Sequence, residues 1–340
     1  MKTFHPQLFT SLQNYSREMF LKDITAGVIV AIIALPLSIA LAIASGVNPE
    51  RGLHTAIIAG FIISFLGGSR VQIGGPTGAY MVIVYGTVMT YGLDGLIMAT
   101  IMSGIMIMAM GFFRLGGVLK FIPHTIITGF TSGIAVTIFS SQVKDFLGLR
   151  IESLPAEFIE KWQVIIESLH TINWVNLGVG VLSLLIIIFF FYYKIKIPGS
   201  LGALVIATLI VQIFQLDVPT IGSKFGELSS QFPSPSLPAF SIEKIRLLLA
   251  PAFTIAVLGA IESLLSAVVA DGMIGAKHRS NTELIAQGLA NIASGIFGGI
   301  PATGAIARTV ANIKNGGRSP VAGMTHAIVL LLVMLLFMPL

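Results

Sequence analysis

Hydrophobic residues occupy long windows of this chain, and charged residues are confined mainly to the short stretches between them. A helix needs about 20 apolar residues to cross the hydrocarbon core of a bilayer. Eleven charge-poor windows, bounded by charged residues or by Gly, Pro and Asn, therefore predict membrane-spanning helices. The windows are Ile24–Gly46, Leu53–Gly67, Thr77–Tyr91, Leu96–Phe113, Thr125–Gln142, Trp174–Tyr193, Leu201–Phe214, Ala252–Ala270, Leu284–Gly298, Ala302–Ile313 and Val321–Leu340.

Composition supports an all-α polytopic membrane protein. Of the 340 residues, 55% are hydrophobic and only 10% are charged, and the mean hydropathy is +0.92. A soluble chain of this size needs more charge on its surface. The absence of cysteine excludes disulfides, thiolate metal sites and cysteine nucleophiles. Because the basic residues are scattered singly, no nucleic-acid partner is expected.

The basic residues also predict how the chain lies in the lipid bilayer. Lys and Arg of the short loops fall mainly on one side, which places the N-terminus in the cytoplasm of a multi-pass inner (plasma) membrane protein. We expect residues 1–22 to form an interfacial cytoplasmic segment and residues 215–250 an extracytoplasmic loop. Residues 23–214 then form a first repeat of seven spans, and residues 251–340 form an incomplete second repeat of four.

Two windows begin with glycine and proline, unlike ordinary spans. In Gly74–Ala79 and Gly298–Ala305 we expect an extended segment, followed by a helix that starts at about the proline. Thr77-Gly78-Ala79 recurs 226 residues later as Thr303-Gly304-Ala305. Interrupted segments at matching places in two halves are typical of a transporter binding site. Seven spans separate the two segments, so the second repeat is inverted relative to the first.

The inversion lets both helix N-termini face one site near the middle of the membrane. Helix N-termini carry unpaired N–H groups and partial positive charge, which suits an anion. The alternative is that Gly and Pro only kink packed helices. The candidate substrate-binding residues are Thr77, Gly78, Ala79, Ala302, Thr303, Gly304, Ala305 and Arg308.

Two charged residues inside predicted spans are functional candidates, because a charge is costly there. Arg308, about two turns after Pro301, would add fixed positive charge for an oxyanion. Glu262 opposes an anion unless the carboxylate is protonated or neutralised, which suggests proton coupling, with Ser266 as a second coupling candidate. The structural alternative is a salt bridge between Glu262 and Arg308 that only joins two helices.

No constellation of an enzyme is found in the sequence. Metal-ligand spacings, a nucleophile with a basic partner and a P-loop are all missing. We therefore expect no enzymatic activity and no cofactor, and any transport would be secondary. The coupling ion would be a proton, with sodium as the alternative.

Seven motifs are spread from about residue 20 to the end of the chain: Asp23–Gly27, Leu35–Ala40, Gly75–Ala79, Phe121–His124, Gly129–Ile134, Gly259–Leu265 and Phe297–Thr309. Together they resemble the sulfate permease (SulP) family of anion transporters. This resemblance implies two inverted repeats of seven spans (7+7), core and gate domains, an anion between the third and tenth helices, elevator-type motion and a homodimer. It also places Glu262 at the family's acidic position, where glutamate is similar to the proton-coupled branch and aspartate accompanies sodium in bicarbonate members.

The chain departs from the family pattern in two ways. Leu37 stands where members often have glutamine after the first-helix proline, and the eleven predicted spans fall short of fourteen spans and a cytoplasmic STAS domain. We therefore expect a truncated version of the fold. The leading function is proton symport of sulfate. Bicarbonate or dicarboxylate uptake, with sodium coupling as a variant, and a non-transporting anion-binding membrane protein or fragment remain open.

Overall fold

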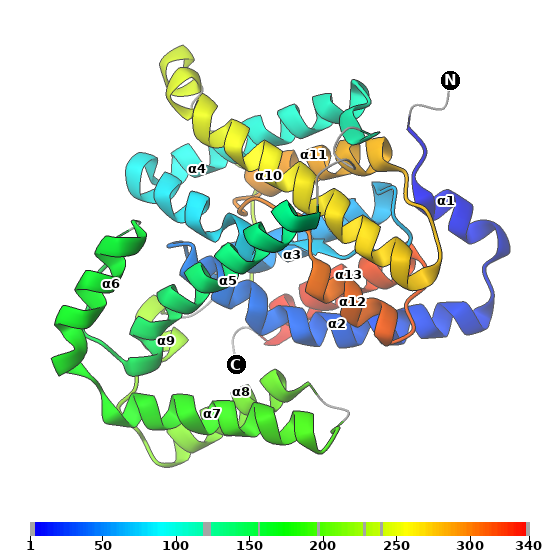
Figure 1. Cartoon of the computed structure of the whole chain (residues 1–340). Coiled ribbons are helices and arrows are strands. Elements are labelled where there is room, and N and C mark those ends of the chain that lie inside the picture. Colours follow the sequence, from blue (N-terminus) through cyan, green and yellow to red (C-terminus); the bar gives the residue numbers. More distant parts are fainter. Residues whose placement is uncertain are drawn as a thin grey trace. The chain divides into compact units, whose positions relative to one another are not determined.

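The computed structural model describes residues 4–117, 124–155, 157–195, 198–226, 229–238 and 241–337, and it confirms the all-α prediction with 76% helix. Figure 1 shows the elements along the chain. The α-helices are α1 (Gln7–Ser11), α2 (Arg17–Ala44), α3 (Pro49–Leu66), α4 (Met81–Phe112), α5 (His124–Leu147), α6 (Phe158–Glu167), α7 (Trp174–Tyr192), α8 (Gly199–Ile213), α9 (Ile221–Phe225), α10 (Ile242–Ile274), α11 (Ser280–Ile296), α12 (Ile306–Lys314) and α13 (Pro320–Phe337). The 3-10 segments are η1 (Leu12–Asn14), η2 (Gly78–Tyr80) and η4 (Ser168–Thr171), and the strands are β1 (Gly74–Gly75) and β2 (Thr303–Gly304).

Each predicted window contains a helix or part of one. The third and fourth windows form two helical stretches of α4 that meet at a kink at Gly92, whose positive φ (φ 69°, ψ −175°) glycine adopts without strain. Of the motifs that carry the family resemblance, residues 121–123 lie outside the described residues. Within the described part, four helical stretches are long and apolar enough to cross a membrane: Arg17–Ala44, Gly78–Phe112, Trp174–Tyr192 and Ile242–Ile274.

The chain folds into two compact units. One comprises Met1–Ile127 and Leu228–Leu340, and the other comprises Thr128–Glu227. The first unit combines helices from both predicted repeats, α2 to α4 and α10 to α13, so a compact unit is not the same as a sequence repeat. The repeat and loop boundaries given above stay a prediction.

Helix packing in the first unit depends on close backbone contact. Helix α4 packs along α10 and α11, while α13 packs on α2 and α3. A methyl group at Gly104 of α4 would lie 2.6 Å from the Gly288 carbonyl oxygen of α11, and one at Gly288 would lie 2.5 Å from the Gly104 oxygen. Small residues of this kind let helices approach within a membrane, where the hydrophobic effect does not drive them together.

A buried carboxylate joins the beginning of α2 to the beginning of α13. Asp23 is fully buried and accepts hydrogen bonds from the Tyr15 hydroxyl (2.7 Å), the Arg318 backbone N–H (2.7 Å) and both the hydroxyl (2.5 Å) and N–H (3.2 Å) of Ser319. Ser319 directly precedes α13. A carboxylate at this place satisfies N–H groups at a helix start and complements its partial positive charge.

We expect Asp23→Ala to destabilise the first unit by about 2–4 kcal/mol, because the change leaves several buried donors without their acceptor. The measurement is the melting temperature of purified protein in detergent. Glu18→Ala is the control, because Glu18 makes only an exposed ion pair with Lys22 and exposed pairs contribute little. Equal melting temperatures for the two variants would contradict a stabilising role for Asp23.

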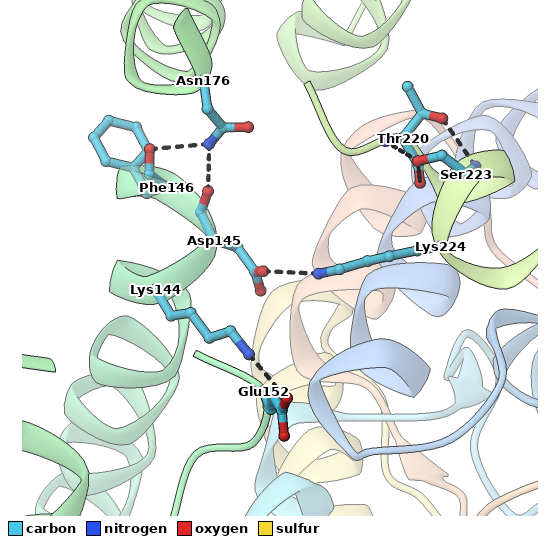
Figure 2. A network of polar contacts seen from close by, with 8 residues as sticks. All are labelled: Lys144, Asp145, Phe146, Glu152, Asn176, Thr220, Ser223 and Lys224. Atoms are coloured by element: carbon cyan, nitrogen blue, oxygen red, sulfur yellow. Dashed lines mark hydrogen bonds and ion pairs between the residues drawn. The ribbon is translucent and has the colours of Figure 1, made fainter. Parts of the chain in front are cut away.

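Polar contacts connect helix ends of the second unit (Figure 2). The Lys224 ammonium lies 3.2 Å from the Asp145 carboxylate at the end of α5, and the Asn176 side chain of α7 donates to the Asp145 carbonyl oxygen at 2.6 Å. Helices α7 and α8 pack against each other. Further contacts in this network are Asn176 to the Phe146 carbonyl, Lys144 to the Glu152 carbonyl, and the reciprocal Thr220 and Ser223 bonds that begin α9.

Candidate functional site

The two broken segments meet in a short antiparallel pair. Gly74 lies opposite Gly304, and Gly75 lies opposite Thr303. The Ala305 N–H extends the pairing by donating to the Ile73 carbonyl oxygen at 2.8 Å. Segments that are more than 220 residues apart in sequence therefore lie side by side, running in opposite directions as an inverted repeat requires.

Both helices start later than the sequence analysis predicted. The chain stays extended through Thr77 (φ −133°, ψ 157°) before η2 and α4, and through Ala305 (φ −92°, ψ 106°) before α12. The prediction that the helices begin at about Pro76 and Pro301 was wrong, because the residues after each proline continue in the extended segment. Arg308 is consequently the third residue of α12 and not two turns into a helix.

The two helix starts provide the groups that an anion site needs. The first N–H groups of a helix have no partner within the helix and carry partial positive charge. Of the predicted substrate-binding residues, Thr77 and Gly78 are partly exposed, whereas Ala79 and the run Ala302–Ala305 are buried. Within this set, Thr77 and Gly78 therefore form the partly exposed edge.

Glu262 connects α10 to both broken segments. The Thr77 hydroxyl donates to the Glu262 carboxylate at 3.1 Å, and the Thr303 hydroxyl lies near the same carboxylate. The Thr303 hydroxyl also donates to the Gly304 carbonyl oxygen at 3.0 Å, so its single proton serves one acceptor at a time. The structure thus brings together three residues that the sequence analysis selected separately.

Arg308 lies behind the paired segments and is only 1% exposed. One of its terminal nitrogens donates to the Pro76 carbonyl oxygen at 2.6 Å, while Nε and NH1 have no hydrogen-bond partner in the protein. No ion pair joins Arg308 to Glu262, both of which the structure describes. The salt-bridge alternative is therefore wrong, because each side chain bonds to the first broken segment.

Ser266 lies one turn after Glu262 and has a different environment. Its hydroxyl is buried and lies 3.3 Å from the Thr309 hydroxyl, which accepts a hydrogen bond from the Ile73 N–H at 3.0 Å. Ser266 therefore links α10 to α12 and, through Thr309, to the residue before β1, and its proposed coupling role stays a prediction.

Buried polar residues that the sequence analysis did not select hold the second broken segment. The Asn291 side chain donates to the Ala302 carbonyl oxygen at 2.8 Å and accepts from the Ala302 N–H at 2.9 Å. The Thr55 hydroxyl accepts from the Ile300 N–H at 2.7 Å, and the Ser294 hydroxyl donates to the Ile300 carbonyl oxygen at 2.7 Å. Their only sequence signal is a polar residue inside an apolar window.

Removing the Asn291 amide should loosen this segment. We expect Asn291→Leu to lower stability by about 1–3 kcal/mol, because both backbone groups of Ala302 are left buried without a partner. Anion binding should weaken at the same time. Melting temperature and equilibrium binding of labelled sulfate measure the two effects. Asn315→Leu is the control, because its amide makes only an exposed bond within α12 and its loop; equal effects would exclude Asn291 from positioning Ala302.

Known proteins share both the sequence and the fold of this chain. A Bacillus subtilis protein named "Putative sulfate transporter YvdB" is 48% identical over 96% of this chain and 62% of its own length. The bicarbonate transporter BicA of Picosynechococcus is 35% identical over 92% of this chain and 57% of its own length. The chain thus spans about 60% of the length of these curated relatives.

Solved structures agree. The transmembrane domain of a cyanobacterial bicarbonate transporter BicA superimposes with a TM-score of 0.86 at 33% identity, covering 96% of this chain and 84% of that one. The structure of SLC26A9 matches in fold with a TM-score of 0.84 at 21% identity, covering 97% of this chain and 56% of that one. The predicted inverted-repeat transporter fold with two broken helices is confirmed. Since the model of the sulfate permease family also matches residues 20–340, the chain belongs to the sulfate permease family.

Proposed function

We propose that this chain forms the anion-binding part of a secondary transporter that carries sulfate together with protons. One observation carries the proposal: the extended segments that precede two helix starts pair with each other beside the buried Arg308. Glu262 accepts a hydrogen bond from Thr77 at the partly exposed edge of this pair. The helix starts and the guanidinium supply positive charge to an anion. The carboxylate supplies a group whose protonation would balance the charge of that anion.

Sulfate is preferred because the relative with 48% identity carries the name "Putative sulfate transporter", and because the site offers backbone N–H groups and a cation suited to an oxyanion. Bicarbonate is the second candidate, supported by the similarity to the BicA proteins in both sequence and structure. A dicarboxylate is the remaining alternative substrate, and sodium is the alternative coupling ion.

Binding and transport should be tested separately. Equilibrium binding of labelled sulfate to the purified chain, with bicarbonate and succinate as competitors, identifies the ligand. Uptake into proteoliposomes under an inward proton gradient or an inward sodium gradient identifies the coupling ion. We expect saturable sulfate binding and proton-driven uptake. If bicarbonate is the only competitor that displaces the label, bicarbonate would take the place of sulfate as the proposed substrate. If the chain binds an anion but shows no uptake under either gradient, its role would be binding alone.

We propose that the protein lies in the inner membrane with its N-terminus in the cytoplasm, and that it forms a homodimer. The chain has no cysteine, so single cysteines report topology without background. We expect Lys22→Cys to react with a membrane-impermeant maleimide only after cell lysis, and Glu243→Cys, in the predicted extracytoplasmic loop, to react in intact cells. The reverse labelling pattern would mean that the topology is inverted.

Mass photometry of detergent-solubilised protein tests whether the protein is a dimer.

A further inference from the structure

Of the twelve buried side-chain nitrogen and oxygen atoms of the described residues that have no hydrogen-bond partner in the protein, five belong to one cluster in the first unit. They are Nε and NH1 of Arg308 on α12, both ring nitrogens of His326 on α13, and the hydroxyl oxygen of Ser64 on α3. His326 is completely buried, Arg308 is 1% exposed and Ser64 is 3% exposed. A buried polar group without a partner is costly, and such groups in native proteins are usually satisfied by protein atoms or by ordered water.

The Arg308 and His326 side chains lie against the same two elements. A methyl group at Gly60 of α3 would lie 3.1 Å from the Gly74 carbonyl oxygen and 3.7 Å from Cε1 of His326. A methyl group at Gly75, the next residue of β1, would collide with NH1 of Arg308 and lie 3.6 Å from the Ala56 Cα, one turn before Gly60. The ring and the guanidinium therefore lie beside neighbouring turns of α3.

Ser64 extends the cluster by one further turn of α3. Its hydroxyl faces Gly323, which precedes His326 by about one turn on α13. The unpaired atoms thus follow one seam between α3 and α13, which begins beside the broken segment β1.

The hydrogen-bonding groups along this seam determine which molecule could join them. The Arg308 nitrogens only donate, whereas a neutral imidazole has one donor and one acceptor nitrogen. A bare anion would accept from Arg308 but could not donate to the imidazole. Water both donates and accepts, and a buried water is stable where two to four polar partners surround it.

We propose that ordered water bridges Arg308 to His326, and that His326 is thereby a positioning residue for the Arg308 charge. This inference rests on the proposed function, in which that charge attracts the anion. The guanidinium is held on one side by the Pro76 carbonyl oxygen and on the other by the bridge to α13. His326 then influences anion affinity without contacting the anion.

A double-mutant cycle on melting temperature tests the bridge without any need for transport. The variants are Arg308→Met, His326→Phe and the double variant of the full chain. Either substitution alone removes the bridge. We therefore expect the melting temperature of the double variant to fall clearly less than the sum of the two single decreases. Thr325→Val is the matched control, since Thr325 is buried on the same helix but faces Gly27 of α2. The decrease in melting temperature caused by Thr325→Val should add to that caused by Arg308→Met. If the decreases caused by His326→Phe and Arg308→Met are also additive, the proposal is overturned.

Labelled-sulfate binding then distinguishes positioning from packing. We expect His326→Phe to raise the Kd about tenfold, and His326→Gln, which keeps one donor and one acceptor group, to stay within about threefold of wild type. If His326→Phe and His326→Gln raise the Kd equally, side-chain shape and not the bridge determines affinity, and the proposal is overturned. If the wild-type chain binds no anion, the proposed function fails, and the melting-temperature cycle alone decides the bridge. If His326→Phe does not fold, the cycle is run with His326→Asn and His326→Leu.

Discussion

Arg308→Ala should weaken sulfate binding by about 30- to 150-fold, which corresponds to about 2–3 kcal/mol for a lost charge-assisted interaction. The guanidinium is buried directly behind the paired segments, where low dielectric strengthens its effect on an anion. Its bond to the Pro76 carbonyl oxygen fixes the charge relative to the start of α4. Loss of that bond would also loosen the extended segment before Thr77.

Equilibrium binding of labelled sulfate measures this effect, and two further variants define its cause. Arg308→Lys keeps the charge but not the planar fork, so we expect an intermediate loss of affinity. Arg318→Ala removes an arginine just after the C-terminal end of α12, whose side chain donates only to the Ile313 and Gly317 carbonyl oxygens, and it should leave affinity unchanged. An unchanged affinity in Arg308→Ala would leave this arginine with a structural role alone.

The sequence predicted the parts of the site that depend on local backbone chemistry. Glycine and proline marked both broken segments, and their matching spacing predicted that the two helix starts would come together, as the pairing of Gly75 with Thr303 shows. A carboxylate in an apolar window identified Glu262 because burial of a charge is costly.

Contacts between distant segments could not be predicted in this way. Asn291 resembles any polar residue in a packed helix until its amide is seen to hold both backbone groups of Ala302. The salt bridge with Glu262 was considered because opposite charges attract, yet the chain directs Arg308 towards Pro76. Helix starts were misplaced because proline is compatible with both an extended segment and a first helical turn.

Glu262→Gln is expected to abolish the pH dependence of sulfate uptake while retaining sulfate binding. In the wild-type protein a charged carboxylate beside the anion repels it, and protonation removes the repulsion, so uptake should rise as the external pH falls. Glutamine matches the protonated carboxyl group in shape and charge, and its amide oxygen still accepts from the Thr77 hydroxyl. The variant should therefore bind sulfate within about threefold of wild type, a difference of under 1 kcal/mol.

The measurement is initial uptake into proteoliposomes at several external pH values, with and without a proton gradient. Glu283→Gln is the control for a buried carboxylate with a structural task, because Glu283 accepts hydrogen bonds from the Gly68 and Ser69 N–H groups and from Gln287. That variant should melt at a lower temperature yet keep the pH dependence. If Glu262→Gln also keeps it, the proton is carried elsewhere and the Thr77 contact serves to hold α10 against the first broken segment. If the pH dependence is lost only from Glu262→Gln, the proton and the anion meet at the edge where Thr77 joins α10.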